Sequence, residues 1–296
     1  MTPPRVLVTG ATGFIGGAVC RALARHGVAV HALTRHGGRP PSAAVPAAAW
    51  HSHDGSDAGL VAILRETRPD AIVHVAAFVP DSEPADVQRI VAGNILFGTQ
   101  LLDAARATGC RDIINTGTYW EHLDGDQAVS LYAALKQAFA RVLQFHCDAH
   151  GMRAVTLTLY DTYGPGDPRG KFVSLLVDAA RTQTPLPASD GQQRIDLLHV
   201  DDVAQAYVVA WQRLATMSEG RHERYAVRSS EAVSLRELAE AVSDVLQCPV
   251  PVEWGARPRR PRTCAVPPAL PILPGWSPQI RLADGVLALA HERAHA

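Results

Sequence analysis

The sequence has little that would direct the protein to nucleic acid or to a membrane. Of its 296 residues, 28 are Lys or Arg and 29 are Asp or Glu, so the net charge is −1 at pH 7. This balance gives no long-range attraction to nucleic acid or to an anionic lipid surface. No apolar run approaches the ~18 residues that a membrane-spanning helix needs, and no secretory leader follows Met1. We therefore predict a soluble, cytoplasmic protein.

Paired cysteines and clustered metal ligands are also absent. The five cysteines are scattered and form no C-x-x-C pair, so we expect free thiols in a reducing compartment. His146 and His150 lie one helical turn apart without a third ligand, so we predict no metal site. Lysine is scarce, since only Lys136 and Lys171 occur. We attribute the excess of arginine to a GC-rich genome and infer that a lysine kept at 136 has a specific role.

Short apolar runs alternate with helical patterns over the first 160 residues. This alternation predicts an α/β fold with a doubly wound parallel sheet of Rossmann type. Prolines become frequent after residue 166. We predict a dinucleotide-binding domain over 1–165, with 197–214 packing back on it, and a smaller substrate-binding domain mainly over 166–296. The predicted strands are 6–8, 28–33, 71–75, 113–115 and 154–159, the helices are 14–26, 60–66, 90–108 and 131–150, and a loop covers 37–50.

Three glycines separate the first predicted strand from the first predicted helix. Gly10 allows a tight turn, Gly13 lets the backbone approach a diphosphate, and Gly16 lets the helix pack closely on the sheet. The start of the helix then offers its N–H groups and a partial positive charge to the phosphates. The residues assigned to this part of a cofactor site are Gly10, Thr12, Gly13, Phe14, Ile15 and Gly16.

The end of the second predicted strand lacks the acid that usually binds the ribose 2′-hydroxyl of NAD. The first carboxylate after the glycine loop is Asp54. Arg35 instead offers a guanidinium that suits a 2′-phosphate, with His36 or Arg39 as possible helpers. We therefore predict NADP(H) in preference to NAD(H). The alternative is that Arg35 is only a solvated loop residue.

Tyr132 and Lys136 lie four residues apart at the start of a predicted helix and so share one face. A phenol has a pKa of about 10, which a nearby ammonium lowers. Tyr132 can then donate a proton to a carbonyl oxygen as hydride reaches the carbon, and Lys136 can also hold the nicotinamide ribose. For a third group that binds the carbonyl we name Thr116 first and Thr118 second; either hydroxyl could instead cap local backbone.

Taken together, these motifs resemble those of the extended short-chain dehydrogenase/reductases, also called the NAD-dependent epimerase/dehydratase family. The matching segments, in order, are TGATGFIG (9–16), HDGSD (53–57), PDAIVHVAA (69–77), NILFGTQLLDAA (94–105), YAALK (132–136), YGPGD (163–167) and LLHVDDVAQAY (197–207). The resemblance implies a homodimer and places Thr116 on the catalytic Ser/Thr. It further implies that Asp54 binds the adenine amine, that Ala76 and Ala77 line the ribose and diphosphate, and that Asn94 braces the active-site strand. Gly55 is also assigned to the cofactor site.

The segments at 115–122 and 159–172 resemble those of nucleotide-sugar 4-ketoreductases that act on deoxysugars. Two departures from the wider family stand out. Its Arg-x-x-Asn before YGP is Thr158 and Asp161 here, and the Asp-Glu pair of the sugar dehydratases is Gly117 and Thr118, which favours reduction over dehydration. The residues assigned to the substrate are Trp120, Asp161, Lys171, Arg194 and Arg259, the two arginines as candidates for a nucleotide diphosphate.

We therefore predict an NADPH-dependent ketoreductase that reduces a keto group, at C4, of a nucleotide-linked deoxysugar. The arginine-rich composition makes antibiotic biosynthesis our interpretation of its setting. A nucleotide-sugar epimerase that retains NAD and a reductase of a non-sugar ketone remain alternatives. A fourth hypothesis is a non-catalytic NADP sensor on the same fold. The presence of both Tyr132 and Lys136 argues against it.

Overall fold

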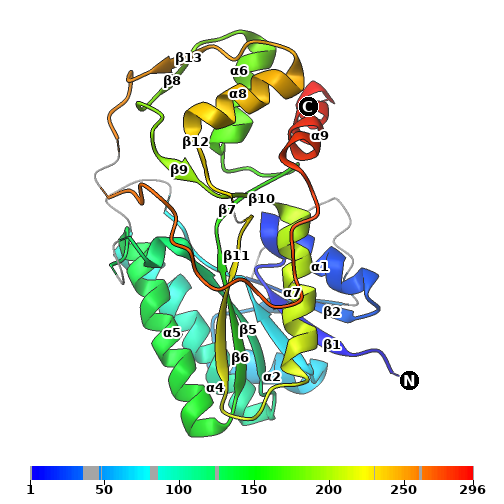
Figure 1. Cartoon of the computed structure of the whole chain (residues 1–296). Coiled ribbons are helices and arrows are strands. Elements are labelled where there is room, and N and C mark those ends of the chain that lie inside the picture. The colour runs from blue at the N-terminus through cyan, green and yellow to red at the C-terminus, as the bar shows by residue number, and fades with distance from the viewer. Residues whose placement is uncertain are drawn as a thin grey trace.

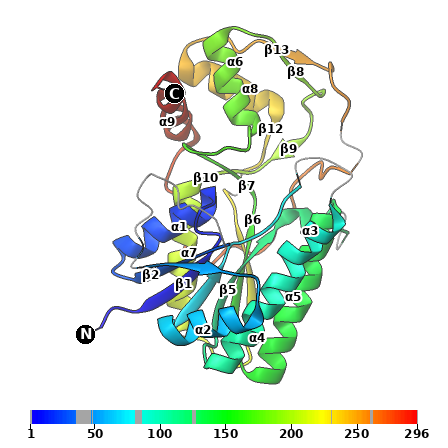
Figure 2. The same cartoon turned by 180° about the vertical axis from the view of Figure 1, so that it is seen from behind.

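The chain folds into two units that lie one above the other (Figure 1). In the larger unit a seven-stranded parallel sheet lies between two layers of helices, and the smaller unit covers the edge at which those strands end (Figure 2). This architecture confirms the predicted Rossmann-type α/β fold. The computed structural model describes residues 2–35, 47, 49–80, 86–123, 127–229, 231–259 and 262–295.

The strand order of the sheet is β11-β6-β5-β4-β1-β2-β3. From β1 the chain first builds outward to β2 and β3, and then returns to add β4 on the other side. In parallel sheets, ligands bind beyond the carboxyl ends of the strands at the point where the order reverses. The strands are β1 Arg5–Thr9, β2 Ala29–Arg35, β3 Ala49–His53, β4 Ala71–His74, β5 Asp112–Thr118, β6 Arg153–Leu159 and β11 His222–Val227.

Helices bury both faces of the sheet, which is why the strands are nearly continuous apolar runs. On one face α1 and α7 pack against Val8 and Ile114. On the other face α2, α4 and α5 pack against Leu7 and Ile113. The helices of this unit are α1 Phe14–Arg25, α2 Asp57–Thr67, α3 Val87–Val91, a π-helical turn η1 Ala92–Leu96, α4 Phe97–Thr108, a 3₁₀ turn η2 Tyr119–Glu121, α5 Leu131–His150 and α7 Val200–Leu214.

The smaller unit has its own apolar core, in which Leu176, Leu238 and Val286 are buried between three helices. The strands β7 and β10 lie between the two units (Figure 1). Its elements are β7 Asp161–Tyr163, α6 Phe172–Thr182, β8 Leu186–Ala188, β9 Arg194–Ile195, β10 Leu197–His199, β12 Val233–Ser234, α8 Leu235–Leu246, β13 Val252–Trp254 and α9 Leu282–His295.

Three features differ from the sequence-based expectation. The end of the predicted loop at 37–50 is part of β3, and the rest of that loop apart from Ala47 lies outside the described residues. Residues 222–227, which we had grouped with the substrate-binding domain, form a strand of the main sheet. The predicted helix 90–108 is interrupted by the π-helical turn at 92–96. None of the helices in the described chain is long and apolar enough to cross a membrane.

Candidate active site

The glycine turn between β1 and α1 has no room for side chains at two of its positions. Gly10 has φ +68°, and a Cβ there would lie 2.8 Å from the backbone nitrogen of Ala76. A Cβ on Gly16 would lie 2.1 Å from the carbonyl oxygen of Gly10. Both positions therefore require glycine. The result is a close contact of β1, the start of α1 and the segment after β4.

The first turn of α1 is open to an anion. Gly13 is its N-cap and has no side chain to accept a hydrogen bond, and the first turn contains no acidic residue. Helix N-termini carry unsatisfied N–H groups and a partial positive charge. A Cβ on Gly13 would meet only the Gly10 carbonyl oxygen, at 3.2 Å, so its outer side is clear. This donor set fits a dinucleotide diphosphate.

The residues assigned to the adenosine end lie together at the ends of β2 and β3. Arg35 ends β2, is exposed, and pairs in register with His53, the residue before Asp54. The Asp54 carboxylate accepts hydrogen bonds from the Ser56 backbone N–H at 2.9 Å and from its hydroxyl at 2.8 Å. These bonds lower the pKa of Asp54. His36 and Arg39 lie outside the described residues.

Ala76 follows β4 beside the glycine turn, where its N–H donates to the Thr9 hydroxyl at 3.2 Å. Asn94 lies in the π-helical turn and is buried. Its amide donates to the Phe78 carbonyl at 2.7 Å, and its side-chain oxygen accepts from the Phe78 N–H at 3.3 Å. The expectation that Asn94 braces the active-site strand is therefore wrong: its contacts hold the segment after β4, next to Ala77.

Helix α5 carries the predicted proton-transfer pair. Ser130 caps the helix by accepting from the Ala133 N–H at 3.3 Å, which fixes its start one residue before Tyr132. The Lys136 ammonium is buried and donates to the Thr116 carbonyl oxygen at 2.8 Å. The bond ties the helix to the end of β5. Burial lowers the pKa of Lys136 to about 8, against the opposing effect of Glu121.

The pKa of the Tyr132 phenol is raised, not lowered as the sequence led us to expect. Burial is the main cause, the Glu121 carboxylate adds to it, and the Arg169 guanidinium opposes both. The phenol is therefore firmly protonated at neutral pH.

The two candidate threonines already have hydrogen-bond partners within the protein. The Thr116 hydroxyl lies 2.8 Å from the His74 carbonyl oxygen and 2.7 Å from the Tyr207 phenol of α7. The Thr118 hydroxyl accepts from the Trp120 N–H at 3.3 Å and so caps η2. The Thr118 contact is the local capping that we weighed against a catalytic role, whereas Thr116 bonds to β4 and α7, which are distant in the sequence.

Glu121 is a buried acid in this region that the sequence analysis did not single out. Its carboxylate accepts from the Thr118 N–H at 2.9 Å and lies over Gly117, whose added Cβ would be 3.1 Å from it. Burial raises the pKa of Glu121, while the Thr118 N–H and Lys136 lower it. The sequence did contain a signal for this position of Glu121, because Thr118-x-x-Glu121 is the pattern of a capping box.

Three of the five residues assigned to the substrate come together with Tyr119 between the units. The Asp161 carboxylate accepts from the Tyr119 phenol at 2.7 Å and from the Lys171 ammonium at 2.9 Å. The same ammonium lies 6.0 Å from the ring centroid of Trp120, and Tyr119 stacks on Tyr160. Tyr119 and Tyr160 are buried in a small apolar core, whereas Trp120 and Lys171 are partly exposed. Trp120 and the Lys171 ammonium are therefore the groups of this cluster that a sugar or a base can reach.

The other two, Arg194 and Arg259, are bonded within the smaller unit. Arg194 donates to the Ala232 carbonyl, and Arg259 pairs with Asp190. The assignment of these two arginines to a diphosphate therefore finds no support in their contacts.

A different arginine reaches from the smaller unit to the glycine turn. Arg169 forms two hydrogen bonds with the Asp167 carboxylate, both at 2.7 Å, and its guanidinium lies 5.1 Å from the centroid of the Phe14 ring. Its electrostatic effect on Tyr132 places it near the phenol as well. The sequence analysis included Arg169 in a matching segment but gave it no role.

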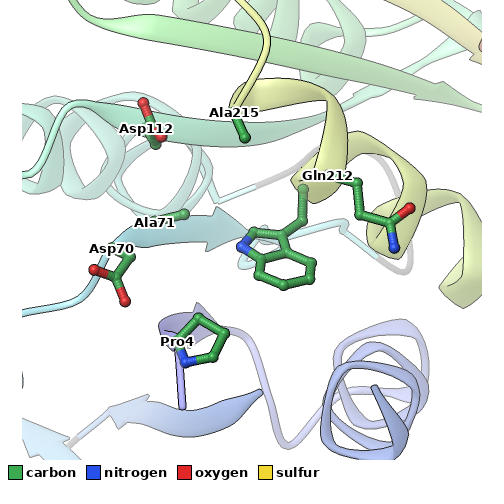
Figure 3. A pocket seen from close by; sticks show the side chains of 7 residues that line it. Pro4, Asp70, Ala71, Asp112, Gln212 and Ala215 are labelled. Atoms are coloured by element: carbon green, nitrogen blue, oxygen red, sulfur yellow. The ribbon is translucent and has the colours of Figure 1, made fainter. Parts of the chain in front are cut away.

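A separate hollow of about 390 Å³ opens at the opposite, amino edge of the sheet (Figure 3). It is lined by Pro4, Asp70, Ala71 and Asp112 near the starts of the strands and by Trp211, Gln212 and Ala215 at the end of α7. Asp70 accepts from the Arg5 N–H, and Asp112 forms a two-bond pair with Arg153. Since these carboxylates serve the packing of strand ends, we do not assign chemistry to this hollow.

Comparison with known proteins identifies the family. The sequence pattern of the NAD dependent epimerase/dehydratase family matches residues 6–226, and the chain belongs to this family. It is accordingly an enzyme of the extended short-chain dehydrogenase/reductase type, as the motifs predicted.

Two curated relatives and one solved structure illustrate the similarity. CDP-abequose synthase of Salmonella typhimurium is 28% identical over 240 residues, which cover 79% of this chain and 78% of that protein. UDP-glucose 4-epimerase of Mycolicibacterium smegmatis is 29% identical, and the match covers 95% of this chain and 96% of that protein. The crystal structure of Thermus thermophilus UDP-glucose 4-epimerase in complex with NAD is 25% identical and has a TM-score of 0.80, covering 99% of this chain and 100% of that chain.

Proposed function

We propose that this enzyme is a ketoreductase that uses NADPH to reduce a keto group, at C4, of a nucleotide-linked deoxysugar. The observation that carries the proposal is the placement of Tyr132 and Lys136. They lie on one turn of α5, tied by Lys136 to the end of β5, at the same edge of the sheet as the open start of α1. A dinucleotide on that helix would bring its nicotinamide to this edge and supply the hydride.

In this mechanism each residue has a limited task. Tyr132 donates its proton to the carbonyl oxygen as hydride arrives at the carbon. Lys136 supplies positive charge beside the resulting phenolate and orients the nicotinamide ribose. We retain Thr116 as the hydroxyl that orients the carbonyl, with Thr118 second; for this, either would have to share or exchange the partner it now has. Trp120, Asp161 and Lys171 would bind the sugar.

Similarity to CDP-abequose synthase supports a sugar reductase. Similarity to UDP-glucose 4-epimerases supports the second candidate, an epimerase that retains NAD. The two differ in the first proton transfer, because an epimerase must begin by removing a proton from a sugar hydroxyl. Reduction instead begins with a protonated Tyr132, the form that burial favours in this structure.

A cofactor-oxidation screen tests the proposal. The purified protein is mixed with NADPH or NADH and a panel of nucleotide-linked keto-deoxysugars, with simple ketones as a further arm. We expect loss of nicotinamide absorbance with at least one keto-deoxysugar and faster turnover with NADPH. Tightly bound NAD after purification, together with interconversion of sugars and no net cofactor consumption, would instead establish the epimerase.

Arg35 should set the cofactor preference. Its guanidinium suits the 2′-phosphate that distinguishes NADPH from NADH. Replacing Arg35 by Ala is expected to weaken NADPH binding about tenfold or more, a loss of at least about 1.4 kcal/mol, while NADH binding stays nearly unchanged. Fluorescence titration with both cofactors measures this, and NADH is the internal control. If binding of NADPH and NADH weakened equally, or if neither weakened, Arg35 would not set the cofactor preference.

We also propose a homodimer. In support, apolar side chains are exposed on neighbouring helices of the larger unit: Val87 is 60% exposed, Leu96 is 53% and Phe145 is 58%. Such exposure is typical of surfaces that another chain covers. Sedimentation of the wild type should show twice the chain mass, and Phe145→Glu should shift the protein toward the monomer. A monomeric wild type would contradict the proposal.

We also propose a cytoplasmic location. In support, the five cysteines form no disulfide.

A further inference from the structure

The buried carboxylate of Glu121 is held by a hydrogen bond near Tyr132 and Lys136, the predicted proton-transfer pair. The 3₁₀ turn η2 returns the chain toward β5, and the carboxylate then lies over Gly117 and accepts from the Thr118 N–H at 2.9 Å. The neighbours of Gly117 on this side include Thr156 and Thr158. Both threonines belong to β6, on the α5 face of the sheet.

Helix α5 contacts this segment through two side chains. The Lys136 ammonium donates to the Thr116 carbonyl at 2.8 Å, and the Gln137 amide donates to the Glu121 carbonyl at 2.6 Å. Residues 116 and 121 are thus both fixed to adjacent positions of one helix turn. Glu121 and Lys136 are therefore both buried beside the end of β5, and the Glu121 carboxylate acts electrostatically on the Lys136 ammonium and on the partly buried Tyr132. Charges interact strongly in such surroundings.

Other charged or titratable groups also face the cluster. Arg169, from the loop before α6, and Tyr207, from α7, act on Tyr132 or are affected by it. Arg224 of β11 and His122 act on Glu121. Among the carboxylates of the described chain, Glu121 is the one that acts on both members of the pair. Burial is the largest effect on Glu121 and raises its pKa, while the Thr118 N–H and Lys136 favour its ionised form.

We propose that Glu121 is a positioning residue whose negative charge keeps protons on both Lys136 and Tyr132, so that the pair begins each cycle as a proton donor. An anion beside an ammonium or a phenol favours the protonated form of each. A reductase needs both protons at the start, whereas an epimerase or dehydrogenase needs the phenolate. The catalytic consequence of this inference rests on the proposed reduction, whereas the effect of Glu121 on the protonation of Lys136 and Tyr132 does not.

Glu121→Gln tests the charge with little change of shape, because the amide oxygen can still accept from the Thr118 N–H. With only two lysines in the chain, the titration of Lys136 can be followed by NMR of ¹³Cε-lysine, and Lys171→Arg assigns the signals. We expect a midpoint for Lys136 near the value of about 8 in the wild type and a clearly lower midpoint in Glu121→Gln. Glu219→Gln, which removes an exposed partner of Arg111, should leave the midpoint unchanged.

The second readout is the pH profile of ketone reduction. Loss of either proton stops donation, so the alkaline limb of kcat/KM should move to lower pH in Glu121→Gln, with the rate at pH 9 reduced about tenfold relative to that at pH 6. Glu121→Asp, which keeps the charge, should restore part of the shift. An unchanged Lys136 midpoint in a folded Glu121→Gln protein would overturn the inference. A shifted midpoint with no reductase activity in the wild type would uphold the inference and refute the proposed function.

Discussion

Tyr132→Phe is expected to lower kcat for reduction by about 10²–10⁴-fold, the range typical of a lost general acid. The ring remains, so packing at the start of α5 should persist and the melting temperature should change little. Dinucleotide binding should persist as well, because the phenol contributes to chemistry and not to the phosphate contacts. Steady-state rates with the keto-sugar found by screening, together with a cofactor titration, measure both effects.

Tyr225→Phe is the matched control for this variant. The Tyr225 phenol contacts Glu223 at 3.1 Å and lies over Arg213, near the end of α7. Its loss should leave kcat within about twofold of the wild type, because the hydroxyl has no part in proton transfer. Undiminished turnover in Tyr132→Phe would remove the phenol from the mechanism. Equal losses in both variants would indicate that the enzyme merely tolerates such changes poorly.

Alanine at two glycines of the turn should give two distinguishable losses. In Gly16→Ala the new methyl would lie 2.1 Å from the Gly10 carbonyl oxygen, so α1 must move, and we expect a loss of about 1–3 kcal/mol in unfolding free energy as well as loss of cofactor binding. In Gly13→Ala the nearest atom is 3.2 Å away and φ is −82°, so the fold should lose no more than about 1 kcal/mol.

The discriminating quantity is cofactor affinity in Gly13→Ala. Its methyl stands where a diphosphate must approach the start of α1, so the dissociation constant should rise at least about tenfold although the protein remains folded. Denaturant unfolding and a dinucleotide titration on the same preparations provide both values. Normal affinity in Gly13→Ala would mean that the diphosphate does not rest on this turn.

The sequence predicted those parts of the site that depend on local chain geometry. Gly10 and Gly16 lie in a turn that admits no side chain, and helix 131–150 has the predicted bounds because Ser130 caps it and Gly151 ends it. Such features depend on neighbouring residues and can be inferred from spacing. The family match then confirmed the fold and the class of enzyme that these motifs indicated.

What the sequence did not predict depends on contacts between distant segments. Residues 222–227 pair with β6 only because the chain returns to the sheet after α7. Asn94 was expected to brace the active-site strand, but the π-helical turn aims its amide at Phe78. Arg194 and Arg259 were chosen for their charge, and they bond within the smaller unit because partners there are closer.

The spacing of Tyr132 and Lys136 also could not predict the direction in which the pKa of Tyr132 shifts. The i, i+4 relation of Tyr132 and Lys136 predicted a phenol with a lowered pKa. Burial and the Glu121 carboxylate reverse the direction in this structure. Burial depends on how the smaller unit and α7 close over the edge of the sheet, which no local pattern records.

The most direct test of the account is a crystal structure of the enzyme with dinucleotide and a bound keto-sugar or its product. We predict phosphates against the N–H groups at the start of α1. The reacting sugar oxygen should lie within about 2.6–3.2 Å of the Tyr132 phenol, and its carbon about 3–3.5 Å from the nicotinamide C4. A nicotinamide ring turned away from Tyr132, or phosphates bound elsewhere than the glycine turn, would contradict the account.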